Sequence, residues 1–294
     1  MKRSVSSVTS RLCWMAEEGA SLVWAGEVPC VISLAAEEVT TLEAPLPFHL
    51  VLPRQSFLPF LTAPAHEYFK PFAPPIGGGE PWYECKGVAL RWELPVGLLF
   101  DVHAGEQRFA DLPWHLTLHF QSLPRALLSS STAGAEAALL NTIKESCYLR
   151  CGTSLPAMSL SLAKQKELTA SLMTNDHSAY CAVASKISAG ISAHLGEGGV
   201  VHAVPIRVFI SPHEWRQQPV APSLSSGEPT RLCDLLETML PSFFGSAASE
   251  TARVIVQGVR VPLDIPVLWL YSMCNHPDGF LYVICQLSAP PLVS

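Results

Sequence analysis

The sequence predicts an α+β fold in which two β-rich units flank a helix-rich unit. Residues 82–120 read as strand, turn, strand, short helix, loop and strand, and a similar order returns over residues 253–286. Between them, residues 127–195 have the apolar spacing of helices. The chain has 294 residues, of which 49% are hydrophobic, so it is long enough for two or three small cores.

The first β-rich unit begins with two predicted strands, Val28 to Leu34 and Phe48 to Leu52. An acidic connection that contains prolines separates them. Ser56 is placed to cap a helix that begins at Phe57. Five prolines between positions 59 and 75 should shorten or break this helix, since proline removes a helical N–H donor.

The rest of this unit follows in residues 82–120. Val88 to Leu94 alternates apolar and mostly polar residues, which predicts a half-buried strand. Pro95 suits the first position of a helix that continues through 97–101, and Trp114 to Phe120 alternates again. Two strands, a helix, two strands and a short crossover helix make the β-grasp order, the fold of ubiquitin.

The middle of the chain is predicted to be helical. After a polar joint, one helix should run from Ala133 to about Leu149, and a second run with helical spacing extends from Leu160 to Leu195. The glycines at 196–199 favour a linker over a phosphate-binding loop, because no strand and lysine surround them. The expected buried stripe of the second run is Leu168, Leu172, Tyr180, Val183 and Ile187.

The last region repeats the plan of the first. Residues 256–259 echo residues 85–88, and Pro95 and Pro266 each lie eight positions after the glycine of that echo. Two distant copies indicate two domains of one type rather than a solenoid, although coincidence is the alternative reading. Thr230 is expected to cap a helix over 232–239. The remaining predicted elements are strands at Val204–Ile210, Gln217–Pro222, Arg253–Val256 and Phe280–Gln286 and a helix after Pro266.

We therefore divide the chain into four segments. Residues 1–22 form a leader or short amphipathic helix around Val8, Leu12 and Met15, and 23–124 form the first β-grasp domain. Residues 125–199 form the helix-rich domain, and 200–290 form the second β-grasp domain. The leader bears arginine and serine, so a mitochondrial presequence is conceivable, but a frayed leader is favoured.

Composition narrows the class of protein. The net charge is −6 and the pI about 5.9, which provides no general electrostatic reason to bind nucleic acid. Mean hydropathy is +0.27, but no run approaches the ~18 apolar residues of a membrane span, so we expect a soluble protein. Nine scattered cysteines without a CxxC pair favour reduced, mostly buried thiols in a cytosolic protein.

Enzymatic readings find little support. His115 and His119, with His103 nearby, suggest a metal site, but exposed or edge-strand histidines are the favoured interpretation because no acidic or thiol ligands complete it. Cys147 and Cys151 are one helical turn apart, which is typical of core packing. The GxSxG, P-loop and dinucleotide motifs are absent. We predict no catalytic residue, no metal and no cofactor, although a cysteine nucleophile with a histidine base stays an alternative.

The chain resembles the autophagy protein 5 family over most of its length, from about Val23 to Leu287. The run Pro95–Asp101, PVGLLFD, is the most distinctive match. The other matching segments are Val23–Pro29, Leu50–Arg54, Leu90–Trp92, Leu112–Trp114, Val204–Arg207, Leu232–Leu236, Pro266–Trp269 and Pro277–Leu281.

The resemblance implies a non-enzymatic role in autophagosome assembly. Family members accept the ubiquitin-like autophagy protein 12 through an isopeptide bond on one lysine, and the conjugate binds autophagy protein 16. This assembly acts like a ligase and promotes transfer of autophagy protein 8 family members to phosphatidylethanolamine. Lys144 stands where the family has its acceptor, early in the helical domain. The implied location is the cytoplasm, with peripheral association at the phagophore or pre-autophagosomal membrane.

Arg54 is the second residue that the resemblance carries over. In the family, an arginine after Leu-Pro helps to line the groove that receives the N-terminal helix of autophagy protein 16. This chain departs from the family at residues 63–80, which are rich in proline and glycine where relatives have a charged helix. Two alternatives stay open: an unconjugated ubiquitin-like scaffold that holds its partner noncovalently, and a β-grasp enzyme.

Overall fold

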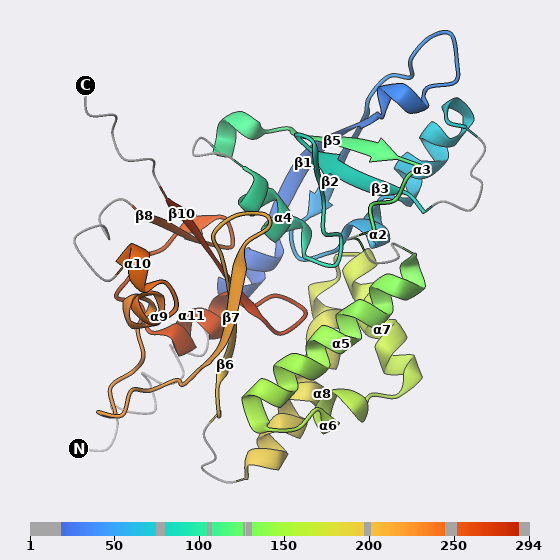
Figure 1. Cartoon of the computed structure of the whole chain (residues 1–294). Coiled ribbons are helices and arrows are strands. Elements are labelled where there is room, and N and C mark those ends of the chain that lie inside the picture. Colours follow the sequence, from blue (N-terminus) through green and yellow to red (C-terminus); the bar gives the residue numbers. More distant parts are fainter. Residues whose placement is uncertain are drawn as a thin grey trace, which may run out of the picture.

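The computed structural model describes residues 19–74, 80–104, 108–125, 127, 131–196, 201–244 and 252–287. It contains two mixed sheets and a bundle of helices, which confirms the predicted α+β class. In Figure 1 the helical bundle packs beside both sheet units. Residues 19–24 are helical, whereas Val8, Leu12 and Met15 of the predicted leader helix lie outside the described residues.

The first sheet has the β-grasp topology, with strand order β2-β1-β5-β3-β4. β1 pairs antiparallel with β2 and parallel with β5, so β5 returns to the centre of the sheet. The strands are β1 (Glu27–Leu34), β2 (Phe48–Pro53), β3 (Trp82–Cys85), β4 (Val88–Ala89) and β5 (Trp114–His119).

Short helices cover this sheet, and the proline-broken helix after β2 is confirmed. Thr62 ends one helix and begins the next. The predicted cap at Ser56 is wrong: Phe57 is the N-cap residue, and Ser56 instead accepts the Val96 N–H through its main-chain oxygen at 2.8 Å. The helices are η1 (Ala36–Glu38), α2 (Leu58–Leu61), α3 (Ala63–Phe69), η2 (Lys70–Phe72), α4 (Val96–His103) and η3 (Arg108–Asp111).

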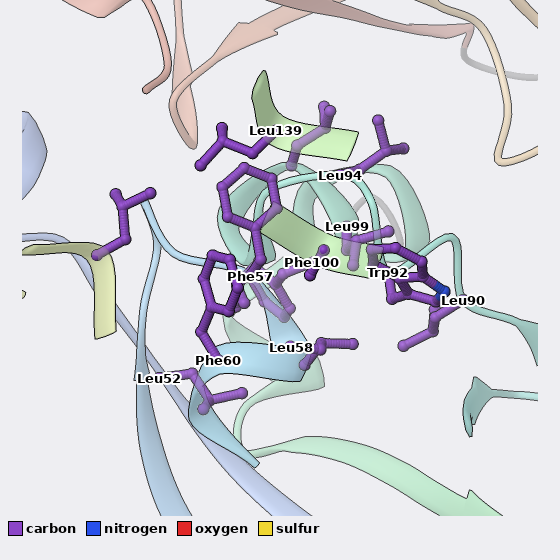
Figure 2. Close-up of a cluster of buried hydrophobic side chains, with 14 of the residues drawn as sticks. Leu52, Phe57, Leu58, Phe60, Leu90, Trp92, Leu94, Leu99, Phe100 and Leu139 are labelled. Atoms are coloured by element: carbon purple, nitrogen blue, oxygen red, sulfur yellow. The ribbon is translucent and has the colours of Figure 1, made fainter. Parts of the chain in front are cut away.

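The predicted strand from Val88 to Leu94 is also corrected. Only β4, Val88–Ala89, is a strand, and a turn follows in which Leu94 N donates to Arg91 O at 2.9 Å. The alternation has another cause, because the apolar residues of this segment enter the core around α4 (Figure 2). Those buried residues are Leu90, Trp92 and Leu94.

The helical unit consists of α5 (Thr132–Cys151), α6 (Leu155–Met158), α7 (Leu162–Met173) and α8 (His177–Leu195). The single run predicted from Leu160 to Leu195 is two helices, because Asn175 has φ 54° and Asp176 caps α8 by accepting Ala179 N–H at 3.0 Å. Four residues of the predicted stripe are buried and Tyr180 packs against the core, so the stripe itself is confirmed.

The second sheet repeats the first, with order β7-β6-β10-β8-β9, which confirms two domains of one type. β6 pairs antiparallel with β7 and parallel with β10. The elements are β6 (Val204–Phe209), β7 (Trp215–Val220), α9 (Leu232–Met239), α10 (Pro241–Phe244), β8 (Ala252–Val256), β9 (Val259–Arg260), α11 (Val267–Cys274) and β10 (Leu281–Leu287).

Two details of the second unit differ from prediction. The N-cap residue of α9 is Arg231 rather than Thr230, whose hydroxyl donates to Ala221 O at 2.8 Å. β7 starts two residues earlier than predicted, because a tight turn places Trp215 opposite Phe209. That turn is closed by Ile210 N–H donating to the main-chain oxygen of Glu214 at 2.9 Å.

The hydrophobic core crosses the boundaries between units. One cluster lies between the second sheet and the helices α9 and α11. The larger cluster joins the first sheet and the helical bundle with residues from the opposite face of the second sheet. These residues are Phe209, Ile255, Phe280, Tyr282 and Ile284. Among the described helices, none is long and apolar enough to cross a membrane.

Candidate functional site

Arg54, directly after β2, forms a buried ion pair with α4. Its Nη2 atom lies 2.5 Å from Asp101 Oδ2 and donates to the main-chain oxygen of Gly97 at 3.3 Å. The side chains of Arg54 and Asp101 are 12% and 2% exposed. A carboxylate is costly to bury without a cation and hydrogen bonds, so Arg54 compensates Asp101. The pair fixes α4 against the end of β2.

Three glycines make room for the Arg54 side chain. A Cβ atom on Gly97 would lie 2.8 Å from Arg54 Cβ, and one on Gly26 would lie 2.7 Å from Arg54 Cδ. Gly258, in the β8–β9 turn, has φ 80°, and its Cβ would lie 3.0 Å from Arg54 Nη2. The turn of the second sheet therefore packs on the guanidinium group that the first sheet holds.

Glutamine side chains connect the two sheet units beside Arg54. Gln55 Nε2 donates to Gln257 Oε1 at 2.9 Å, and Gln257 Nε2 lies 3.2 Å from His276 Nδ1. Because an amide nitrogen only donates, His276 Nδ1 must accept, which requires it to carry no proton. Burial, followed by the Arg54 charge, lowers the pKa of His276 to about 3, so its ring is neutral at pH 7.

A second polar contact joins α5 to the second sheet. Arg207 Nη2 lies 2.9 Å from Glu145 Oε2, and Gln217 Nε2 donates to Glu145 Oε1 at 2.6 Å. The Arg207 guanidinium also stacks 4.0 Å from the centre of the Phe280 ring. Glu145 thus binds β6 and β7 together and sets the position of α5 along them.

Lys144 directly precedes Glu145 in α5. Its Nζ atom donates to Asn141 Oδ1 at 3.3 Å. Lys144 is partly exposed. It lies on the same face of the helix as Asn141 and Tyr148, which are both exposed. While Glu145 turns to the second sheet, Lys144 lies on the outer side of α5.

Three other lysines of the described residues have carboxylate partners. Lys70 Nζ lies 3.6 Å from Glu67 Oε1, and Lys86 Nζ lies 3.0 Å from Asp111 Oδ1. Lys164 pairs with Glu167 on α7. Lys144 differs from these three lysines because the contact described for it is with a neutral amide.

The histidine interpretation needs a correction. His115 is exposed, but His119 is buried on the central strand β5 and stacks on Trp82 with ring centres 4.0 Å apart. Glu38 fixes the chain directly after β5, since its Oε2 atom accepts the Phe120 N–H at 2.6 Å. The parallel return of β5 explains the difference, because it moves this segment from an edge to the centre. Among the described residues, no group of three histidine, cysteine or acidic side chains could hold a metal ion.

The cysteine pair of α5 is part of the core. Cys147 and Cys151 are 0% and 1% exposed, which confirms the prediction of core packing. Burial raises the pKa of the Cys147 thiol to about 11, so it stays protonated and is a poor nucleophile near neutral pH. The eight cysteines that the structure describes are all free thiols.

Lys144 and Arg54 lie on different units, and each is next to a contact with the second sheet. No role was predicted from the sequence for Asp101, which pairs with Arg54, or for Glu145 and Arg207, which join α5 to the second sheet. A cationic partner for Asp101 could have been predicted from the sequence, because a single carboxylate inside an apolar helical run needs a cation nearby. The contact between Glu145 and Arg207 could not have been predicted from the sequence, since it depends on how the helical bundle packs on the second sheet.

Three family models match the chain in order. They are described as the autophagy protein ATG5 UblA domain, over residues 23–120, its alpha-helical bundle region, over 133–190, and its UblB domain, over 203–285. Together they cover more than half of the sequence.

Individual proteins match over nearly their full length. Autophagy protein 5 of Arabidopsis thaliana is 26% identical, covering 94% of this chain and 99% of the plant protein. Autophagy protein 5 of Penicillium rubens is 27% identical, with 90% and 95% covered. The crystal structure of Kluyveromyces marxianus Atg5 superposes with a TM-score of 0.75 at 23% identity, covering 91% of this chain and 99% of that one. The chain belongs to the autophagy protein 5 family.

Proposed function

We propose that this chain accepts autophagy protein 12 through an isopeptide bond on Lys144. Family membership supports the conjugation system as the context. The observation that carries the choice of residue is the position of Lys144 on the outer side of α5, where its amine donates only to the Asn141 amide oxygen at 3.3 Å among its described contacts. A conjugating enzyme can approach such an amine without opening the core.

The proposed reaction is an acyl transfer. The Lys144 ammonium loses a proton, and its nitrogen attacks the thioester carbonyl that joins the modifier's C-terminal glycine to a cysteine of the conjugating enzyme. The new C–N bond forms as the C–S bond breaks, and the enzyme thiolate leaves. This chain supplies only the nucleophile and the surface that presents it, so its role in the reaction is that of an acceptor.

We also propose that the conjugate, with autophagy protein 16, promotes lipidation of autophagy protein 8 family members. In this proposal the chain is a non-catalytic subunit of a ligase-like assembly. It is cytoplasmic and reaches the phagophore membrane peripherally, through the complex.

For Arg54 we propose a place in the groove that receives the helix of autophagy protein 16. Its guanidinium group already binds the Asp101 carboxylate and the Gly97 main-chain oxygen, and its side chain is 12% exposed. Arg54 would therefore act mainly by fixing the junction of the two ubiquitin-like domains that forms the groove, rather than by pairing with the partner's charges. Loss of the pair should weaken partner binding even though few partner atoms touch it.

Reconstituted conjugation tests the acceptor. The mixture contains this chain, its organism's autophagy protein 12, the activating and conjugating enzymes and ATP, and the product is followed on a denaturing gel. We expect a slower, reductant-resistant band that disappears with Lys144→Arg. Lys186→Arg, at an exposed lysine of α8, is the matched control and should leave the band unchanged.

The remaining outcomes separate the alternatives. A band that survives Lys144→Arg would mean that another lysine is the acceptor. Absence of a band with either chain, while the proteins still copurify, would support an unconjugated ubiquitin-like scaffold. A third reading, a β-grasp enzyme, would require a cysteine that an electrophilic substrate analogue traps. Burial raises the pKa of Cys30 and Cys285 to about 12, which disfavours both thiols as nucleophiles.

A further inference from the structure

The second ubiquitin-like sheet ends at β7, whose outer edge has no neighbouring strand among the described residues. An edge strand presents main-chain N–H and C=O groups that can pair with another extended chain. The side chains of Arg216, Gln218 and Pro219 are exposed along this edge. β7 is therefore available to a partner in a way that the central strands are not.

The pairing register shows which main-chain groups point outward. Pro205 lies opposite Pro219, and neither proline has an N–H, so these two residues cannot exchange hydrogen bonds. In an antiparallel pair, hydrogen-bonded and non-bonded positions alternate. The pairs two and four residues away, which contain Gln217 and Trp215, are then also non-bonded. The main-chain N–H and C=O groups of Gln217 and Trp215 therefore face away from β6, as does the carbonyl of Pro219.

A groove lies directly beside this edge, between β7 and α9. It has a volume of about 300 Å³. Val220, Leu235 and Met239 form part of its lining and are 8%, 3% and 4% exposed. Leu224, which is 42% exposed, lines it from the loop that follows β7. An apolar side chain that leaves a strand paired with β7 would enter this groove.

The charge at the groove suggests the character of such a partner. Asp234 is the charged residue that lines it within the described part of the chain. One of its carboxylate oxygens, Oδ2, accepts the Arg231 N–H at 2.8 Å, which caps α9. A carboxylate can accept several more hydrogen bonds, so it favours a cationic side chain next to the apolar anchor.

We propose that β7 and this groove form a peptide-binding site. The partner is an extended segment that adds a strand to the edge at Trp215 and Gln217. It places one aliphatic or aromatic side chain in the groove and a neighbouring lysine or arginine near Asp234. Main-chain pairing supplies part of the affinity and the groove supplies the selectivity, as in other strand-addition complexes. This site is separate from Lys144 and does not depend on conjugation.

Selection from a displayed library of ten-residue peptides, with the full chain as bait, tests the site. An enriched peptide is then labelled with fluorescein and titrated by fluorescence anisotropy. We expect enriched peptides to combine an apolar anchor with a basic neighbour. Thr238→Arg, at an exposed residue that lines the groove, should lower affinity by at least about tenfold. Glu237→Arg, at the neighbouring exposed residue outside the groove lining, is the control and should not.

Amide exchange measured by NMR gives an independent readout. Bound peptide should slow exchange of the outward N–H groups of Gln217 and Trp215 and leave the opposite edge, β9, unchanged. Asp234→Asn keeps a capping oxygen, so it should preserve folding while removing the preference for basic peptides. Peptides that bind Thr238→Arg equally well, or a selection that yields none protecting Gln217, would overturn the proposal. Conjugation at Lys144 should proceed normally in Thr238→Arg, which distinguishes this site from the proposed acceptor.

Discussion

Replacing Asp101 with alanine should destabilise the chain more than any surface ion-pair change. The carboxylate is 2% exposed and its partner Arg54 is 12% exposed, so the substitution leaves a cation largely out of water. Breaking a buried pair by removing one partner typically costs about 3–5 kcal/mol. Arg54 keeps its bond to the Gly97 oxygen at 3.3 Å and a little solvent contact, so we expect the low end, about 3 kcal/mol.

Urea unfolding followed by circular dichroism measures this loss as a lower midpoint with an unchanged slope. Asp111→Ala is the matched control. Its partner Lys86 lies 3.0 Å away, but the side chains of Lys86 and Asp111 are 65% and 27% exposed. Such a pair should contribute at most about 1 kcal/mol.

A double-mutant cycle isolates the pair itself. Arg54→Met combined with Asp101→Ala removes both charges, so the double variant should be more stable than the sum of the single losses predicts, by about 2 kcal/mol. An Asp101→Ala loss no larger than that of Asp111→Ala would refute the reasoning. Additive single effects would also show that the two residues act independently, despite their 2.5 Å separation.

Three further predictions concern the same junctions. Gly258→Ala should cost about 1–2 kcal/mol in urea unfolding, because φ is 80° and the new Cβ would lie 3.0 Å from Arg54 Nη2. The pKa of His276 is lowered to about 3, so the unfolded chain takes up its proton first and stability falls as pH drops below about 6.5. His276→Asn should therefore flatten stability between pH 6.5 and 4. Glu145→Ala should cost about 1–2 kcal/mol, because it leaves Arg207 without its carboxylate.

Each of these has a contrasting outcome. A Gly258→Ala chain as stable as the unaltered one would mean that the β8–β9 turn can move away from Arg54. An unchanged pH slope in His276→Asn would assign acid sensitivity to other groups, such as His66, whose pKa burial lowers to about 4. For Glu145→Ala, protease sensitivity of α5 around residue 145 should rise, and unchanged resistance would contradict a positioning role for the contact.

The order of elements was predictable because the apolar periodicity is strong. The repeated glycine and proline spacing identified two β-grasp units, since each glycine lies in the turn between two strands and each proline precedes a helix. Local capping was harder to predict. Ser56 and Thr230 are good capping residues by propensity, but tertiary contacts use them differently: the main-chain oxygen of Ser56 binds Val96, and the Thr230 hydroxyl binds Ala221.

The burial of a side chain on a strand was hard to predict where it depends on whether that strand lies at the edge or in the centre of the sheet. His119 reads as an edge residue because it lies near the end of an alternating segment. It is buried because β5 inserts between β1 and β3, and a single sequence does not show that crossover. The same limit applies to Leu90, Trp92 and Leu94, which alternate without forming a strand because α4 folds back over them. The pairing of Arg54 with Asp101 depends on this same approach of α4 to β2.

The shared core has a consequence for synthesis on the ribosome. β10 is a central strand of the second sheet, yet it is the last strand of the described chain, ending at Leu287. Phe280, Tyr282 and Ile284 from this end of the chain complete the core under the first sheet and the helical bundle. Earlier units therefore emerge with an apolar face that stays partly uncovered until β10 follows. Nascent chains that stall before β10 should expose part of this face and require chaperone protection until β10 has been made.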